Sequence, residues 1–299
     1  MGRQSRLHPR NKHRNEYDFL ALCTVHPELK KHVFVNDYNT ETIDFSNSKA
    51  VKELNTALLF TYYSIIFWEF PDTNLCPPIP GRVDYIHHIE DVLNASNVKN
   101  IKALDIGTGA SCIYPILGNK VYGWQFVATD IEKDSLKYAQ QILIENKLED
   151  QIELRLQNDK KHIFKDILSQ NDKFTVTICN PPFYKSIAEA EQENSRKNKG
   201  LNKDTNQRNF AGVENELSYK GGEKAFLHTY LYESSQYKKQ CFWYTSLVSK
   251  KENVQSMYSS LEKLGATAIK TIPMQQGNKV TRIVAWTFLN EKEQQEWSS

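Results

Sequence analysis

From residue 101 onward, segments typical of strands and of helices alternate along the chain. Strand segments rich in β-branched and aromatic residues are expected at 101–106, 125–130, 152–156, 174–179, 241–248, 266–272 and 282–289. Helical spacing predicts the intervening helices at 112–117, 133–146, 162–169, 223–237 and 250–264. Such alternation requires a mostly parallel sheet with helices on both faces. The last two strands have no helix between them, so we expect them to be antiparallel.

The first 80 residues follow a different pattern, which predicts an accessory subdomain. It has helical spacing in two segments and short alternating, hairpin-like segments between them, at 16–23, 48–63, 32–36 and 42–45. Four prolines between residues 71 and 81 exclude regular structure there and predict a linker packed on the next unit. We therefore expect residues 1–80 to form the accessory region and residues 81–292 the α/β domain, whose first helix begins at Arg82.

The N-terminal 14 residues are strongly basic. They contain five arginines and lysines and no acid, although the formal net charge of the whole chain is only +2. Affinity for a nucleic acid must therefore come from local clusters of positive charge. One interpretation is that Arg10, Lys12 and Arg14 contact RNA phosphates and that the segment also directs the protein to the nucleus. The other is a solvated, disordered tail.

A glycine turn follows the first predicted strand of the α/β domain. Gly107 and Gly109 stand where the backbone can turn tightly and approach a ligand closely. A dinucleotide fingerprint requires a third glycine, but Cys112 occupies that position. Asp105, beside the turn, suits an ammonium group such as the one on the amino-acid end of S-adenosylmethionine. Asp130, at the end of the next strand, stands where an acid commonly binds ribose hydroxyls.

The sequence Asn-Pro-Pro-Phe at 180–183 follows the fourth predicted strand, and ligands of open α/β sheets bind beyond such strand ends. The Asn180 amide offers both an acceptor and donors, while Pro181 and Pro182 have no N–H and leave carbonyl acceptors. Phe183 adds a flat face for stacking. These groups suit adenine, whose exocyclic amino group would donate to Asn180 and to the Pro181 carbonyl. The alternative is a Pro-Pro turn with Phe183 in the core.

Residues 185–222 form a long polar stretch inside the α/β domain. A structureless loop of this length is usually either functional or disordered. We interpret it as a flexible lid over a polymeric substrate, with Arg196 and Lys197 in contact with RNA, and a disordered insertion is the alternative. Lys161, which lies just before the helix expected at 162–169, either contacts substrate or cofactor at the crevice rim or is merely solvated.

Several function classes lack their usual sequence signatures. The eight histidines show no paired spacing typical of metal ligands, so we expect no metal. Five scattered cysteines without Cys-x-x-Cys spacing indicate neither a disulfide framework nor a zinc site. No apolar run approaches the roughly 20 residues that cross a bilayer, and the basic N-terminus lacks the apolar segment of a secretory signal. Neither a nucleophile elbow nor a Walker phosphate loop is present.

With these motifs, the chain resembles the methyltransferase-like family of RNA adenine N6-methyltransferases. Members of that family act on U6 small nuclear RNA in eukaryotes and on large-subunit ribosomal RNA in bacteria. The resemblance extends from about residue 8 to 290 and rests on these segments: Leu104-Asp-Ile-Gly-Thr-Gly-Ala-Ser-Cys-Ile-Tyr-Pro-Ile-Leu-Gly118, Gly123-Trp124, Ala128-Thr-Asp130, Cys179-Asn-Pro-Pro-Phe183, Gly221-Gly222-Glu223, Trp243-Tyr244, Tyr85-Ile-His87, His8-Pro-Arg-Asn-Lys12 and Tyr17-Asp-Phe19.

The resemblance implies a Rossmann-like class I methyltransferase fold, in the α/β class, with a seven-stranded, mostly parallel sheet and an N-terminal extension of helices and a hairpin. It implies S-adenosylmethionine as cofactor and N6-methyladenosine, in a structured RNA with an unpaired adenine, as product. Residues 180–183 would hold the adenine, and the basic N-terminus and the lid would grip RNA. The lysine-bearing loop before His162 would gate the cofactor pocket. The residues implied to surround the cofactor are Arg82, Gly107, Ser111, Asp130, His162 and Asn180.

The same resemblance sets expectations for substrate, location and assembly. We expect U6 small nuclear RNA as substrate, a nuclear location with some protein in the cytoplasm, a monomer, and no membrane partner. Alternatives are a ribosomal RNA adenine, a DNA adenine, a protein glutamine, or a non-enzymatic RNA-binding protein. Asp130 stands where the closest eukaryotic members carry Glu, a mild departure. The sequence has no counterpart of the vertebrate C-terminal RNA-binding region, so functions that depend on it are not expected.

Overall fold

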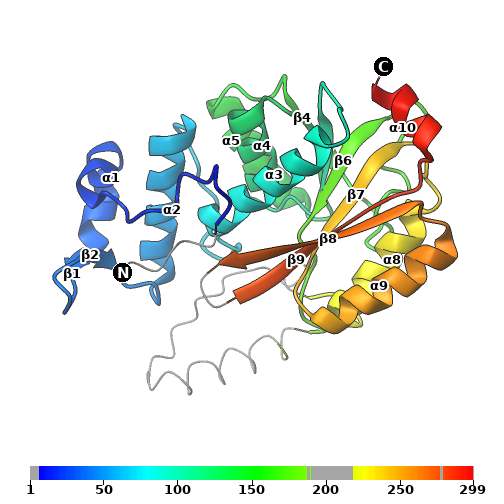
Figure 1. The fold of residues 1–299 in the computed structure, drawn as a ribbon. Coiled ribbons are helices and arrows are strands. Elements are labelled where there is room, and N and C mark those ends of the chain that lie inside the picture. The colour runs from blue at the N-terminus through cyan, green and yellow to red at the C-terminus, as the bar shows by residue number, and fades with distance from the viewer. Residues whose placement is uncertain (1–6, 187–188, 190–217, 277–278, 299) are drawn as a thin grey trace.

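A computed structural model of the chain describes residues 7–186, 189, 218–276 and 279–298. The fold is built on a seven-stranded sheet with the strand order β5-β4-β3-β6-β7-β9-β8 (Figure 1). Only β9 runs against the others, because β9 is antiparallel to both β7 and β8. The strands are β3 (Lys102–Ile106), β4 (Gln125–Asp130), β5 (Ile152–Leu156), β6 (Phe174–Cys179), β7 (Cys241–Val248), β8 (Ala268–Gln276) and β9 (Lys279–Thr287).

Helices cover both faces of this sheet and bury its two central strands completely. On one face lie α3 (Ile79–Asn94), α4 (Ile113–Tyr122) and α5 (Lys133–Glu145), and on the other α8 (Gly222–Ser234) and α9 (Lys251–Leu264) (Figure 1). Every residue of β6 and β7 is buried, which explains their nearly continuous apolar sequences. The predicted seven-stranded, mostly parallel sheet with an antiparallel last pair is confirmed.

The N-terminal region packs directly on this unit. It contains α1 (Phe19–Val25), a 3₁₀ turn (Pro27–His32), the antiparallel hairpin β1 (Val33–Val35) and β2 (Glu41–Ile43), and α2 (Ser48–Tyr63). The expected helices and hairpin are therefore present. Their apolar side chains join those of α3, α4 and α5 in one continuous core. Residue 80 consequently marks a change of architecture and not the edge of a separate core.

Several expected elements and boundaries differ in the structure. The helix expected at 162–169 is wrong: this stretch is a series of turns, because the Glu233 carboxylate accepts the N–H groups of Ile163 and Phe164 and because Asp166 has a positive φ of 65°. Helix α3 begins at Ile79 and not at Arg82, with a proline in its first turn, where its missing N–H costs nothing. A final helix, α10 (Glu291–Ser298), runs past the expected limit at 292.

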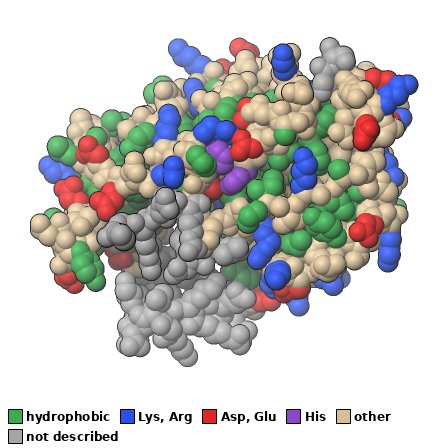
Figure 2. All heavy atoms as spheres, in the orientation of Figure 1, with side chains coloured by type: hydrophobic (Ala, Val, Ile, Leu, Met, Phe, Trp, Pro, Cys, Tyr) green, Lys and Arg blue, Asp and Glu red, His purple; other side chains and the backbone are tan. Residues whose placement is uncertain are grey.

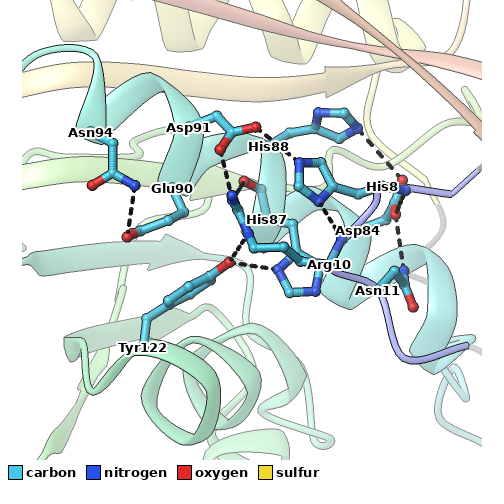
Figure 3. Close-up of polar contacts among 10 residues, drawn as sticks. All are labelled: His8, Arg10, Asn11, Asp84, His87, His88, Glu90, Asp91, Asn94 and Tyr122. Atoms are coloured by element: carbon cyan, nitrogen blue, oxygen red, sulfur yellow. Dashed lines mark hydrogen bonds and ion pairs between the residues drawn. The ribbon is translucent and has the colours of Figure 1, made fainter.

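The N-terminal basic segment is docked along helix α3 (Figure 3). Asp84 is almost fully buried and accepts hydrogen bonds from the His8 backbone N–H at 2.7 Å and from the Asn11 side-chain amide at 2.9 Å. The same Asn11 amide also donates to the Pro80 carbonyl at 2.9 Å. The His8 ring pairs with Asp91 at 2.9 Å. Residues about seventy positions earlier in the sequence therefore supply hydrogen bonds to the first two turns of α3.

This docking buries two histidines, and it makes folding sensitive to pH. Burial lowers the pKa of His13 and of His87 to about 4, with the positive charges of Lys12 and of Arg10 contributing. An unfolded chain protonates both histidines below about pH 6.5. The unfolded state therefore binds more protons between pH 6.5 and 4, and stability falls as the pH is lowered through that window.

We expect the free energy of unfolding to fall by about 2 kcal/mol on account of His13 alone between pH 7 and pH 5. Urea unfolding at the two pH values measures this loss. In His13→Gln, which has no group that titrates in this range, the loss should be smaller by that amount. An equal pH-dependent loss in His13→Gln would contradict the assignment.

Candidate active site

The ends of three neighbouring strands meet at one point of the sheet. Ile106, the last residue of β3, pairs with Thr129 of β4 on one side and with Cys179 of β6 on the other. The chain winds outward from β3 to β4 and β5 in one direction, and β6 and β7 lie on the opposite side. This is the topological switch point of an open α/β sheet, where ligands bind. Gly107, Asp130 and Asn180, each following a paired residue, are therefore neighbours.

The glycine turn is held by β4. Both Gly107 and Thr108 donate their backbone N–H to the Thr129 carbonyl at 2.9 Å, and Gly109 donates to the Asp130 carboxylate at 2.8 Å. Gly107 has a φ of +75°, a left-handed conformation that favours glycine. A Cβ at Gly107 would touch no protein atom, so the backbone conformation and not local crowding requires this glycine.

A pocket opens beside this turn. Seven predicted site residues contribute to it directly: Arg82, Gly107, Gly109, Ser111, Asp130, Asn180 and Pro182. The sequence alone did not single out its other lining residues, which are Leu75, Pro77, Thr108, Ile113, Tyr114 and Glu132. Leu75 and Pro77 belong to the proline-rich segment, which was expected to pack on the next unit and does so as a wall of the pocket. Thr108 and Glu132 could have been found by extending each strand-end motif by a few residues.

Arg82 enters the pocket from the first turn of α3. Its guanidinium donates to the Tyr114 hydroxyl at 2.9 Å and stacks over the Tyr114 ring at 5.6 Å. Its Nε is buried and has no hydrogen-bond partner. Arg82 therefore makes an aromatic contact at the pocket and keeps a donor available to a ligand.

Asp105 lies directly behind the pocket lining. It is 1% exposed, and neither of its carboxylate oxygens has a hydrogen-bond partner of ordinary geometry. Burial raises the pKa of Asp105 to about 7, and the neighbouring Thr108 hydroxyl offsets only part of this rise. A buried carboxyl group with no partner is costly to the fold alone, and a cation delivered by a ligand would complete it.

Asn180 presents a second unpaired group. Its Oδ1 atom is buried in the pocket lining without a partner. Pro182 also lines the pocket, whereas Pro181 is buried and Phe183 is half-buried outside the lining. Among the residues that the structure describes, seven buried side-chain polar atoms lack a partner, and five of them belong to Arg82, Asp105, Thr108 and Asn180. The polar groups that the fold leaves incomplete are therefore concentrated at this pocket.

His162 and Lys161 lie in the loop after β5, away from the lining. The His162 ring hydrogen-bonds to the Glu233 carboxylate at 3.0 Å, which fixes the loop to α8. Lys161 is exposed. The structure does not bring either side chain into the pocket, so their contacts with cofactor and RNA remain predictions.

The expected RNA-binding residues of the N-terminus differ in how available they are. Arg10 is paired with Asp91 at 2.7 Å and also donates to the Tyr122 hydroxyl (Figure 3). Lys12 donates to the Tyr62 carbonyl at 3.1 Å. Arg14 is exposed and makes one long hydrogen bond of 3.5 Å, to the Pro9 carbonyl. Arg196 and Lys197 lie outside the described residues. On the face seen in Figure 2, basic side chains are spread among acidic ones, as the small net charge leads one to expect.

The sequence profile of an RNA methyltransferase family matches residues 1–290. The chain belongs to this family. It is 49% identical to the ribosomal RNA large subunit methyltransferase F of Flavobacterium psychrophilum over 304 aligned positions. This alignment covers 98% of the present chain and 97% of the relative. The protein of the same name from Shewanella oneidensis is 47% identical, and its alignment covers all of the present chain and 86% of the relative.

Solved structures resemble the methyltransferase over almost its whole length. The human METTL16 catalytic domain in complex with a MAT2A 3′UTR hairpin superposes with a TM-score of 0.81 at 30% identity and covers 96% of this chain and 97% of the other. The N-terminal domain of human METTL16 in complex with SAH gives 0.77 at 27% identity, with 95% and 99% covered. The Rossmann-like methyltransferase fold is thereby confirmed, and S-adenosylmethionine is the cofactor.

These relatives correct two expectations. The nuclear location inferred from the basic N-terminus is wrong, because the relatives that share nearly half of the sequence come from bacteria, which have no nucleus. U6 small nuclear RNA is likewise not supported as the substrate, whereas the ribosomal RNA alternative agrees with the relatives' names. No helix within the described ranges is long and apolar enough to span a membrane. No group of three or more metal-ligating side chains is found in that part of the chain either.

The pocket fits the chemistry of S-adenosylmethionine. We expect Asp105 to hold the ammonium of the cofactor as a carboxylate, so affinity should rise with pH as Asp105 ionises near pH 7. Calorimetric titration with the demethylated cofactor should show roughly tenfold tighter binding at pH 8 than at pH 6, the ratio of the ionised fractions. Asp105→Asn should bind weakly at both pH values. An affinity that is independent of pH would contradict this role for Asp105.

Proposed function

We propose that this methyltransferase transfers a methyl group to the N6 atom of an adenine in large-subunit ribosomal RNA. One observation carries the proposal: the unpaired, buried Oδ1 of Asn180 lies in the same pocket as the glycine turn and Asp130. An amide acceptor at this point suits a substrate that brings an N–H group. The names of the bacterial relatives support ribosomal RNA as the polymer.

The chain's own contribution to the reaction is binding and orientation. When bound, S-adenosylmethionine supplies a methyl group that its sulfonium already makes strongly electrophilic. Asn180 and the Pro181 carbonyl would accept the two N6 protons of the adenine. That geometry favours the pyramidal nitrogen that forms during attack and aims its lone pair at the methyl group. No general base is required before attack, because the methylated nitrogen is cationic and acidic and releases one of its two protons to water afterwards. Phe183 would stack on the ring of an adenine extruded from a loop or bulge.

Cofactor contacts would come from the three strand ends. The backbone of Gly107, Gly109 and Ser111 can lie close to the ligand because no side chain intervenes at the glycines. Asp130 and Glu132 present carboxylates suited to ribose hydroxyls. Arg82 retains a buried donor for a ligand oxygen.

We assign the grip on RNA to the N-terminal region and to the stretch 185–222. The N-terminal segment lies on α3, the helix that carries Arg82 into the pocket. The two ends of the other stretch meet where Tyr184 pairs with Ser218 and where Tyr219 donates its N–H to the Tyr184 carbonyl at 3.0 Å. The stretch therefore starts and finishes beside the 180–183 segment. The N-terminal segment and the described ends of the stretch thus adjoin the two elements, α3 and the 180–183 segment, that contribute Arg82 and Asn180 to the pocket.

A product assay tests the proposed reaction. Purified protein and labelled S-adenosylmethionine are incubated with large-subunit ribosomal RNA, a U6-like hairpin and a glutamine-bearing peptide, and the labelled residue is identified after digestion. We expect N6-methyladenosine in the ribosomal RNA. Labelled glutamine in the peptide, with no label in RNA, would favour a protein substrate, for which the same Asn-Pro-Pro-aromatic chemistry is suited.

Asn180→Ala tests the role of the amide. Because it removes an acceptor needed in the transition state, we expect the transfer rate to fall by roughly a hundredfold or more while RNA affinity is retained. Filter binding with labelled RNA provides the control. Methylation near the unsubstituted level in Asn180→Ala would show that this mechanism is wrong.

Arg14→Ala tests the N-terminal RNA contact. If Arg14 neutralises one phosphate, the substitution should lower the slope of log affinity against log salt by about one unit of charge. Lys263→Ala is the matched control, because Lys263 is exposed on α9, which covers the opposite face of the sheet from α3. Equal slopes for Arg14→Ala and the unsubstituted protein would remove Arg14 from the RNA-binding surface.

A further inference from the structure

Four buried hydroxyl side chains form a connected network behind Asn180. Tyr85 of α3, Thr177 of β6, Tyr230 of α8 and Thr245 of β7 are each fully buried. The Tyr85 hydroxyl lies 2.7 Å from the Thr245 hydroxyl, which donates to the Thr177 carbonyl. The Tyr230 hydroxyl contacts the Thr177 hydroxyl and donates to the Thr245 carbonyl at 3.1 Å. One cluster thus ties two strands to a helix on each face of the sheet.

The hydrogens of this network have only one consistent arrangement. The Thr245 hydroxyl donates its single proton to the Thr177 carbonyl. In its contact with Tyr85 it can therefore only accept, and Tyr85 is the donor. The Tyr230 hydroxyl donates its single proton to the Thr245 carbonyl, so in the contact between Tyr230 and Thr177 the Thr177 hydroxyl is the donor. The Thr177 hydroxyl also accepts the Thr245 backbone N–H at 3.0 Å. Every hydroxyl donor is used, and such fully satisfied buried networks hold one geometry.

The hydroxyl network joins β6 to β7 beyond the last backbone pair of these two strands. On the β3 side, β6 is paired up to Cys179, the residue before Asn180. On the β7 side, the named pairs are Phe174 with Cys241 and Val176 with Trp243. Beyond Val176, Thr177 and Thr245 link the two strands through hydrogen bonds of their side chains. The Tyr85 hydroxyl also lies near the backbone of Cys179, the residue before Asn180.

We propose that Tyr85, Thr177, Tyr230 and Thr245 are positioning residues that fix Asn180 for methyl transfer. The inference rests on the proposed function of Asn180 and adds a specific support to it. Asn180 follows Thr177 by three residues, at the end of a strand that the backbone ladder holds on one side and the network on the other. Tyr85 lies one turn after Arg82 on α3, so the same helix reaches both the cofactor pocket and the network.

Core packing alone does not explain why hydroxyl residues occupy these four positions. Valine has nearly the shape of threonine, and phenylalanine nearly that of tyrosine, so an apolar cluster would fill the same space. Replacing paired polar groups by apolar ones of equal shape can be nearly neutral for stability. What the hydroxyls add is directional bonding that resists a shift of the β6 end. A shift of about 1 Å at such a point can reduce a reaction rate about a hundredfold.

Substitutions at Thr245 test the proposal. Thr245→Val removes the hydroxyl at this position, whereas Thr245→Ser keeps the hydroxyl and removes only the methyl group. Tyr85→Phe is a milder variant that leaves Thr245 bonded to Thr177 and guards against failure of Thr245→Val to fold. Thr287→Val is the matched control. Thr287 is also fully buried in the sheet and its hydroxyl accepts one backbone N–H. It is the last residue of β9, which runs antiparallel to β7 and therefore ends on the side of the sheet away from Asn180.

The readouts are the single-turnover rate at saturating RNA and cofactor, the affinities for RNA and for the demethylated cofactor, and the melting temperature. We expect Thr245→Val to slow transfer roughly ten- to hundredfold and Tyr85→Phe to slow it less, while both affinities stay within about threefold. Thr245→Ser should recover most of the rate. Thr287→Val should lose comparable stability and keep its rate.

The assay counts labelled methyl groups in RNA whichever base carries them, so its outcome does not depend on the identity of the modified nucleoside. A rate for Thr245→Val no lower than that of Thr287→Val would overturn the proposal. So would a failure of Thr245→Ser to recover activity, or a loss that lies in cofactor or RNA affinity instead of in the transfer step.

Discussion

The pairing of Ile106 with strands on both of its sides is the constraint on which the site depends. Because β3 is hydrogen-bonded to β4 and to β6, the three strands end at one level of the sheet. Each strand end then delivers one chemical part: the glycine turn after Ile106, the carboxylate of Asp130, and the amide of Asn180. The register of the sheet therefore brings together residues that are far apart in the sequence, and each site residue lies at or just after the end of its strand.

In the described part of the chain, most of the buried side-chain polar atoms without a partner lie at the pocket, and the buried polar groups elsewhere are largely paired. Asp84 inside the N-terminal docking surface, Glu233 beneath the loop after β5, and the hydroxyls around Thr245 all have their partners. Asp105 and Asn180 keep oxygens without any. Such groups reduce stability when they are left alone, so their concentration at one place is physically meaningful. It agrees with the proposal that a cofactor ammonium and a substrate amino group bind there.

Local sequence rules recovered most of the architecture because strong local signals and tertiary structure agreed. The apolar strands β6 and β7, the glycine turn and the α2 helix were all expected at or close to their observed positions. The helix expected at 162–169 was not recovered, because its amide groups bind the distant Glu233 instead of their own helix. The docking of His8 and Asn11 on α3 was equally invisible, since its partners lie about seventy residues away and share no pattern with them.

By itself, the sequence determined the fold class, the family and the chemistry of the strand-end motifs, because period, turn residues and short motifs are properties of neighbouring residues. Only the tertiary structure decided which polar atoms remain unpaired, that Arg82 faces the pocket over Tyr114 while His162 turns to Glu233, and that hydroxyls from four separate elements converge behind Asn180. The physical reason is that burial and hydrogen-bond satisfaction depend on every element that packs around a group, and no stretch of sequence contains that information alone.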